Sequence, residues 1–159
     1  MGVYVVTGSA SGMGRASAER LRAAGHTVIG VDIRDADVVA DLSTPQGRSD
    51  AIRGTLDRAG ATLDGAVLAA GLGPTPGREP LIAQVNVRGV IDLLVGWRPA
   101  LAAAGNSKVV VFGSNSTTTT PGVPNSAVKA FLAGDMDKGV ARATRIAKAG
   151  PPFTYAASK

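Results

Sequence analysis

The sequence predicts an α/β fold in which helices cover both faces of a doubly wound parallel sheet. Apolar runs of about five residues alternate along the chain with segments of helical spacing. Runs without polar alternation are typical of parallel strands that are buried on both faces. Glycines stand beside several of these runs, where they indicate tight turns. The hydrophobic fraction of 45% and the charged fraction of 18% are those of an ordinary globular protein.

The first sixty residues are predicted to form two helices that alternate with strands. The first helix covers 12–24, because apolar residues recur there at helical spacing and Gly25 ends the pattern. The second helix begins after Thr44, which can cap it, with Pro45 at its first position, and runs to about 59. Strands are expected at 3–7, 27–32 and 38–40.

The rest of the chain adds two strands and a helical region. The strands are expected at 65–69 and 108–112, on either side of a helical stretch over about 81–104 in which Pro99 predicts a bend or break. Because crossovers between parallel strands are right-handed, the expected strand order is 3-2-1-4-5. Two further helices, at about 126–133 and 135–149, end at Gly150-Pro151-Pro152 and form a helical insertion over about 115–152.

Charge and composition exclude several classes of protein. The net charge of +5 is partly local, because four basic residues lie three or four positions apart on one predicted helix. We interpret them as a solvated face and expect no nucleic-acid partner, since no aromatic residues interleave with them. These basic residues are Lys138, Arg142, Arg145 and Lys148.

Other features narrow the setting of the protein. The chain has no cysteine and no histidine or carboxylate cluster with metal-ligand spacing, so no metal site is expected. No apolar run approaches the length of a membrane span, and the N-terminus lacks the basic segment of a signal peptide. We therefore expect a cytoplasmic protein without a membrane partner.

A glycine-rich loop connects the first predicted strand to the first helix. Its sequence, Thr7 to Gly14, is TGSASGMG. The first N–H groups of a helix and its dipole favour an anionic diphosphate, and glycines let a phosphate approach the backbone. The loop alone is a weak signal, but its place between strand and helix predicts a dinucleotide site. The candidate cofactor-binding residues in it are Gly8, Ser11, Gly12, Met13 and Gly14.

An acidic residue at the end of the second strand supports this interpretation. Asp32 stands 18 positions after Gly14 (32 − 14), where a carboxylate can accept hydrogen bonds from both ribose hydroxyls and repels a 2′-phosphate. Asp32 therefore predicts NAD rather than NADP, and Ile33 beside it is a further candidate cofactor-binding residue. Two alternatives remain: Asp32 can simply form a turn, and Arg34 can accept a 2′-phosphate.

These residues resemble the short-chain dehydrogenase/reductase family. Its TGxxxGxG pattern is matched from Thr7 to Gly14, and its YxxxK signature is matched by Tyr155 and Lys159. The resemblance implies a Rossmann-like dinucleotide-binding domain over 1–159 that is incomplete at its C-terminus. It also implies cofactor contacts from Asp41, Leu42, Ala70, Gly71, Tyr155 and Lys159. One departure is the pair Ala69-Ala70, where the family usually has asparagine before Ala-Gly.

The resemblance also implies the catalytic residues. Tyr155 would act as general acid and base, and Lys159, one helical turn further on, would stabilise its phenolate and hold the nicotinamide ribose. Ser114 would bind the substrate oxygen, and Asn86 would support a water-linked proton path to Lys159. Ser116 is a neighbouring hydroxyl that can be mistaken for the catalytic one, and the family pattern favours Ser114.

Within the family, the chain resembles the bacterial 3α-hydroxysteroid dehydrogenase/carbonyl reductase branch. The runs HTVIGVDIRDADVVADLSTPQGR and GAVLAAGLGP and the spacer of 41 positions between Ser114 and Tyr155 (155 − 114) carry this likeness. It implies a homodimeric, NAD-dependent oxidoreductase for secondary alcohols and ketones, plausibly a hydroxysteroid or another bulky carbonyl compound. The alternative is a non-catalytic dinucleotide sensor of the same fold. Because family members continue well beyond the YxxxK signature, we expect residues 1–159 alone to be inactive.

Overall fold

The structure is a computed structural model that describes residues 1–145 and 150–159. The described residues form two compact units. The first unit combines Met1–Ala70 with Val90–Phe112, and the second combines Gly71–Gly89 with Gly113–Lys159. The single domain expected over residues 1–159 stays a prediction. No helix among the described residues is both long and apolar enough to cross a bilayer.

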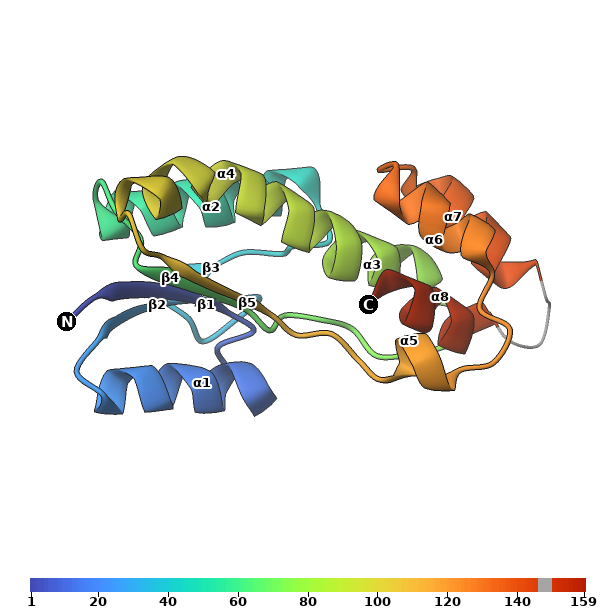
Figure 1. The fold of residues 1–159 in the computed structure, drawn as a ribbon, viewed down its shortest axis with the longest axis horizontal. Coiled ribbons are helices and arrows are strands. Elements are labelled where there is room, and N and C mark those ends of the chain that lie inside the picture. Colours follow the sequence, from blue (N-terminus) through green and yellow to red (C-terminus); the bar gives the residue numbers. More distant parts are fainter. Residues whose placement is uncertain (146–149) are drawn as a thin grey trace. The chain divides into compact units, whose positions relative to one another are not determined.

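The first unit contains a five-stranded parallel sheet in the order β3-β2-β1-β4-β5 (Figure 1). This confirms both the predicted fold class and the predicted strand order. In the middle of the sheet, Val5 of β1 is paired with Ile29 on one side and Ala66 on the other. The strands are β1 Val3–Thr7, β2 Thr27–Asp32, β3 Val38–Val39, β4 Gly65–Leu68 and β5 Lys108–Val111.

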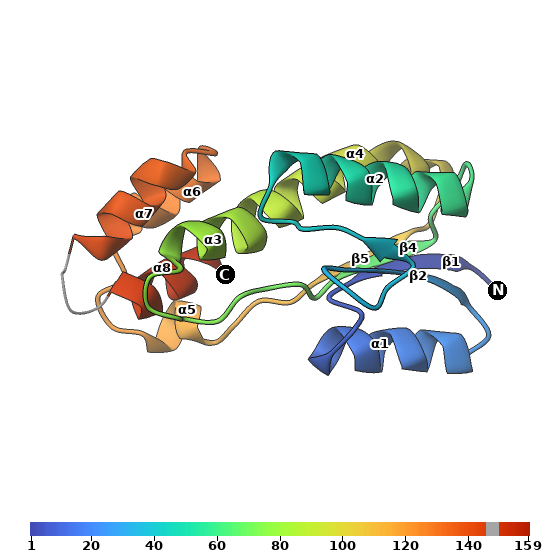
Figure 2. The ribbon, with the colours of Figure 1, turned by 180° about the vertical axis from the view of Figure 1, so that it is seen from behind.

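Helices cover both faces of this sheet. Helix α1 (Gly12–Ala23) lies on one face, and α2 (Pro45–Ala59) and α4 (Val90–Ala103) lie on the other (Figures 1 and 2). As predicted, the Thr44 hydroxyl oxygen caps α2 by accepting the Gly47 N–H at 2.9 Å. The main core lies beneath α2 and α4 and includes the fully buried Trp97.

Helix α4 runs through Pro99, so the break that the sequence allowed there does not occur, whereas a bend at Pro99 stays a prediction. Proline removes the N–H that would bond the carbonyl four residues earlier, which here belongs to Val95. Pro99 and Val95 both lie on the exposed side of α4. The carbonyl that loses its donor is therefore on the side of the helix that water reaches.

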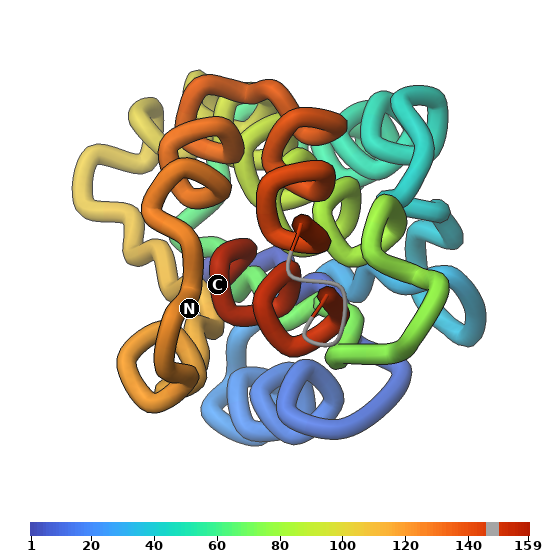
Figure 3. Tube along the Cα trace, turned by 90° about the vertical axis from the view of Figure 1, so that its right-hand side faces the viewer, coloured from blue at the N-terminus to red at the C-terminus, as the bar shows by residue number. Residues whose placement is uncertain are grey.

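The second unit is helical, as expected for the insertion after β5. Figure 3 shows α6 and α7 side by side, and Gly139 of α7 makes this packing close, since a Cβ there would lie 2.2 Å from the Phe131 ring. The predicted basic face includes exposed Lys138 and Arg145, whereas Lys148 lies outside the described residues. The helices are α3 Glu79–Ala83, η1 Gln84–Gly89, α5 Ser116–Thr119, α6 Asn125–Leu132, α7 Met136–Thr144 and α8 Gly150–Ser158.

Two features of this unit differ from the sequence-based prediction. The predicted long helix over 81–104 is irregular at η1, a π-helical segment, rather than at Pro99. The insertion was expected to end at Gly150-Pro151-Pro152, but these residues form the first turn of α8. Proline is tolerated there because the first N–H groups of a helix have no partner within it. Tyr155 therefore lies in the middle of α8, and Lys159 directly follows its end.

Candidate active site

The glycine loop in the first unit is tightly packed at one glycine and open at another. A Cβ at Gly14 would lie 2.1 Å from the carbonyl oxygen of Gly8, so α1 can start this close to β1 only with glycine at position 14. Gly12, with φ of +53°, has no atom within 4 Å of a Cβ position. The side chain of Ser11, the N-cap of α1, makes no capping hydrogen bond, and that of Met13 is 61% exposed. The start of α1 is thus open to a ligand.

Asp32 is tied to this loop. Its Oδ2 accepts the Ala10 N–H at 3.0 Å, and its Oδ1 accepts the Ile33 N–H at 2.7 Å. The carboxylate at the end of β2 is therefore fixed next to the loop, and its contact with a cofactor ribose stays a prediction. The Ile33 side chain is 61% exposed and adds an apolar surface beside the carboxylate.

Asp41 and Leu42 follow β3, and a buried arginine holds the Leu42 backbone in place. The Arg48 guanidinium donates to the Leu42 carbonyl at 3.0 Å and to Asp92 at 2.8 Å, and Arg48 is only 4% exposed. The Leu42 side chain belongs to the core, so this residue can contact a cofactor only through its backbone. Asp41 is exposed, and its Oδ1 accepts the Ser43 N–H at 2.9 Å.

The end of β4 is fastened to β1 by a hydroxyl. The Oγ1 of Thr7 accepts the N–H groups of Ala69 and Ala70, at 3.1 and 3.0 Å. Ala70 also lies against Gly8, where a Cβ would be 2.9 Å from the Ala70 nitrogen. The open helix start, the fixed Asp32 carboxylate and the exposed Met13 and Ile33 side chains fit a dinucleotide laid along this end of the sheet.

In the second unit, the predicted catalytic residue Asn86 makes three hydrogen bonds through its side chain. It lies on η1 and is 5% exposed. Its Oδ1 accepts the Leu72 N–H at 2.8 Å, and its Nδ2 donates to the Leu72 carbonyl and to the Ser158 hydroxyl, both at 3.1 Å. Ser158 directly precedes Lys159, so the amide connects the segment after Gly71 to the end of α8.

Lys159 lies close to both Gly71 and Tyr155. A Cβ at Gly71 would be 2.8 Å from the Lys159 Nζ and 3.3 Å from the Asn86 Oδ1, so glycine leaves room for both atoms. The same Nζ is 5.9 Å from the centre of the Tyr155 ring. Burial removes water from the ammonium and lowers the pKa of Lys159 below its ordinary value of 10.5. Three predicted catalytic residues, Asn86, Tyr155 and Lys159, are thus brought together.

The fourth predicted residue, Ser114, is half-buried in the segment after β5. Its Oγ accepts hydrogen bonds from the backbone N–H and the hydroxyl of Ser116, at 3.2 and 2.9 Å. Among residues 1–145 and 150–159, no hydrogen bond joins Ser114 to Tyr155. Ser116, whose hydroxyl the family pattern does not favour as the catalytic one, is therefore a direct hydrogen-bond partner of Ser114.

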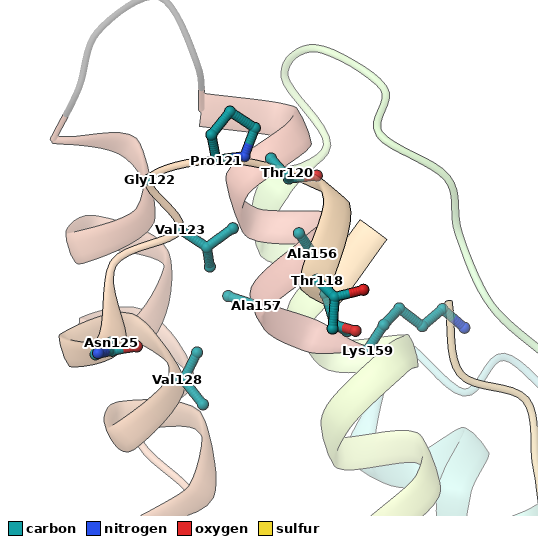
Figure 4. Close-up of a pocket in the computed structure, with 11 residues that line it drawn as sticks. Thr118, Thr120, Pro121, Gly122, Val123, Asn125, Val128, Ala156, Ala157 and Lys159 are labelled. Atoms are coloured by element: carbon teal, nitrogen blue, oxygen red, sulfur yellow. The ribbon is translucent and has the colours of Figure 1, made fainter. Parts of the chain in front are cut away.

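A cavity of about 490 Å³ borders α5, α6 and α8 (Figure 4). Threonines of the α5 region form one side of it, and Val123, Val128 and Ala157 form another. The ammonium of Lys159, which also lines it, points away from Val123 and Val128 in Figure 4. Ser114, Asn86 and Tyr155 are not among its lining residues, so the cavity borders the helix with the reactive groups without containing them.

Sequence reasoning missed several partners of the candidate residues. Leu72 and Ser158 hold Asn86 and carry no signal in the sequence beyond lying next to Gly71 and Lys159.

The first unit contains a cavity of about 400 Å³ that the sequence did not indicate, lined by Ser9 and Asp37 among others. Asp37 accepts the Gly30 N–H at 2.6 Å and lies 3.5 Å from Arg22. A clue was the glycine inside β2, because a Cβ at Gly30 would lie 2.6 Å from the Ser9 Oγ.

The parallel sheet, the open start of α1 and the cluster of Asn86, Tyr155 and Lys159 resemble the short-chain dehydrogenase/reductase type of α/β protein. The chain is 37% identical, over all 159 residues, to the 3α-hydroxysteroid dehydrogenase/carbonyl reductase of Comamonas testosteroni, and it covers 62% of that protein. The chain is thus similar to this dehydrogenase along its whole length and spans less than two thirds of it. No family model matches the sequence.

Solved structures show the same relationship. The 3α-hydroxysteroid dehydrogenase of Pseudomonas sp. B-0831, crystallised with NADH, is 44% identical and superposes on 99% of this chain with a TM-score of 0.91. A short-chain dehydrogenase/reductase superfamily protein of Agrobacterium tumefaciens with bound NAD is 30% identical over 72% of this chain, with a TM-score of 0.56. The chain spans 61% and 33% of these two proteins, respectively.

Proposed function

We propose that this chain is part of an NAD(H)-dependent oxidoreductase that interconverts a secondary alcohol and a ketone. The observation that carries the proposal is the meeting of Asn86, Tyr155 and Lys159 in one unit, where the Lys159 ammonium lies 5.9 Å from the Tyr155 ring. A dinucleotide sensor would need the glycine loop but not this phenol and ammonium. The hydroxysteroid dehydrogenases to which the chain is similar support a hydroxysteroid or another bulky carbonyl compound as substrate.

The residues of this chain divide the work of such a reaction. In alcohol oxidation, Tyr155 takes the hydroxyl proton of the substrate as general base, and in ketone reduction it returns that proton as general acid. The Lys159 ammonium stabilises the phenolate, and Ser114 donates a hydrogen bond to the substrate oxygen as charge develops on it. Asn86 holds the backbone around Leu72 and the end of α8, which keeps Lys159 in place.

The cofactor that we propose is NAD, with NADP as the weaker ligand. The chemistry that NAD supplies when bound is hydride exchange with the carbinol carbon of the substrate. The start of α1 would hold its diphosphate, and the Asp32 carboxylate would accept hydrogen bonds from the adenosine ribose and repel a 2′-phosphate. Gly71 and Lys159 would lie at the nicotinamide end. The same proposal includes a homodimer, which the resemblance described in the sequence analysis implies, and a cytoplasmic location, which the lack of a signal peptide and of a long apolar run in the sequence favours.

The test uses the full-length protein that contains this chain. NADH formation is followed by absorbance with a panel of hydroxysteroids and simple secondary alcohols, for the wild type and for Tyr155→Phe, which removes only the hydroxyl. We expect NAD-linked turnover that Tyr155→Phe abolishes while NADH binding, measured by fluorescence, is retained. A wild-type protein that binds NADH but turns over no alcohol or ketone in the panel would instead be a dinucleotide sensor.

A further inference from the structure

We propose that Ser116 is a positioning residue that makes the Ser114 hydroxyl a hydrogen-bond donor toward the substrate oxygen. This inference rests on the proposed function and deepens it, because it concerns the same carbonyl or alcohol oxygen that Ser114 binds. In the sequence alone, Ser116 is only a hydroxyl that can be mistaken for that of Ser114, and the structure gives it a role of its own.

Ser116 contributes two donors to one oxygen. Its backbone N–H lies 3.2 Å from the Ser114 Oγ, and its own hydroxyl donates to the same Oγ at 2.9 Å. A serine hydroxyl has two lone pairs and one proton. When both lone pairs accept from Ser116, the proton of Ser114 is the only hydrogen-bonding capacity that remains to it. Ser114 then meets a substrate oxygen as a donor rather than as an acceptor.

The backbone of Ser114 is held as well. Its carbonyl accepts the Thr117 N–H at 3.3 Å and the Thr117 hydroxyl at 2.9 Å. The hydroxyls of Thr118 and Thr119 both bond to the carbonyl of Asn115, each at 3.0 Å. The polar run after Ser114 therefore turns its threonine hydroxyls back onto the backbone, whereas the Ser116 hydroxyl is directed at the Ser114 side chain.

This arrangement suits the charge that develops during the reaction. A hydroxyl that accepts hydrogen bonds becomes a better donor, because the bonds in a chain polarise one another. A donor set in advance at the substrate oxygen stabilises an alkoxide-like transition state more than the neutral ketone. Loss of the Ser116 hydroxyl should therefore lower kcat more than it changes KM.

The experiment compares Ser116→Ala with Ser116→Thr, which keeps a hydroxyl, and with Thr119→Ala as the matched control. Thr119 is exposed and belongs to the same short helix, but its hydroxyl bonds to the Asn115 carbonyl. In the full-length enzyme, kcat and KM for ketone reduction, the NADH dissociation constant and the melting temperature are measured. We expect Ser116→Ala to lower kcat by about three- to tenfold, the effect of one ordinary hydrogen bond, at unchanged NADH affinity and melting temperature. Ser116→Thr should recover most of this loss, and Thr119→Ala should match the wild type.

A double-mutant cycle distinguishes the inference from the proposed function. In a Ser114→Ala background, the second change Ser116→Ala should cost less than about twofold in the residual kcat, because the two hydroxyls act as a unit. An inactive Ser114→Ala with a fully active Ser116→Ala overturns the inference alone, as does an equal loss in both backgrounds. If Ser114→Ala keeps wild-type turnover, the assignment of Ser114 in the proposed function is wrong.

Discussion

The side-chain amide of Asn86 forms hydrogen bonds with both the backbone N–H and the backbone carbonyl of Leu72. The Asn86 side-chain oxygen accepts the Leu72 N–H at 2.8 Å, and the side-chain nitrogen donates to the Leu72 carbonyl at 3.1 Å. One amide side chain thereby satisfies both backbone groups of a residue in an irregular segment. The remaining N–H of the same amide bonds to Ser158 and so connects this segment with α8.

We predict that Asn86→Asp is as damaging as Asn86→Ala. Aspartate keeps the acceptor for the Leu72 N–H but loses both donors and places a carboxylate against the Leu72 carbonyl. Each variant should lower the free energy of unfolding by about 1–3 kcal/mol, because buried polar groups lose their partners. Urea unfolding checks this, with Asn125→Ala on the exposed start of α6 as a control that stays within about 0.5 kcal/mol of the wild type. An Asn86→Asp variant of wild-type stability would contradict the prediction.

Alanine substitutions of Gly12 and Gly14, at the start of α1, should differ in their effects on stability and NADH affinity. A Cβ at Gly14 meets the Gly8 backbone, so Gly14→Ala should displace α1 and lower both the melting temperature and the NADH affinity. A Cβ at Gly12 enters open space, so Gly12→Ala should cost only about 1–2 kcal/mol for its left-handed backbone. Its NADH affinity should nevertheless fall, because the added methyl group occupies the space proposed for the diphosphate. Thermal melts and fluorescence titrations separate the two effects. Wild-type NADH binding by Gly12→Ala would mean that the cofactor does not approach this turn.

Asp32→Ala tests the cofactor preference. The change removes the carboxylate that would bond to the ribose and repel a 2′-phosphate, and it leaves Arg34 nearby. The ratio of kcat/KM for NAD over NADP should fall by about 10- to 100-fold, the range expected for hydrogen bonds to a charged group. The matched control is Asp57→Ala, which removes an exposed carboxylate from α2 and should leave the ratio unchanged. If Asp32→Ala keeps the wild-type ratio, another residue determines the preference.

The pH dependence of stability should carry a contribution from Lys159. Its pKa in the folded protein is lowered by burial, so between that lowered value and 10.5 the unfolded chain binds more protons than the folded one. The Lys159 contribution therefore makes stability rise with pH across this window, and its penalty is fully present below it. Urea unfolding between neutral pH and 10.5 should show that Lys159→Met flattens the rise. Lys129→Met, which removes an exposed lysine of α6, should preserve it. Parallel curves for wild type and Lys159→Met would contradict the prediction.

The sheet and the helices around it are the part of the structure that local sequence predicts well. Valine-rich runs, the Thr44-Pro45 helix start and the glycine loop are short-range signals, and each corresponds to an observed element. Candidate residues such as Asp32 and Asn86 were found because their types and positions match a family pattern. Asp32, the last residue of β2, lies against the glycine loop.

The irregular parts were not predictable from local sequence in the same way. The π-helical segment η1 has a hydrogen-bonding pattern that no residue type enforces, and we placed the irregularity at Pro99 because proline is the visible signal. Likewise, Leu72, Ser158 and Asp37 matter through side-chain contacts between elements far apart in sequence. Such contacts exist only after the chain has packed, which is why residue type alone does not reveal them.

The double hydrogen bond at Thr7 bears on how relatives of this chain are recognised. Ala69 stands directly before Ala70-Gly71, where the family pattern favours asparagine, and a search that demands asparagine there would discard this sequence. The threonine at the end of β1 already engages both main-chain amides of that turn. The backbone there needs no help from the side chains at 69 and 70. Threonine at position 7 is accordingly a marker of this turn that does not depend on asparagine before Ala70, and homologues with the same exchange should be sought by that criterion.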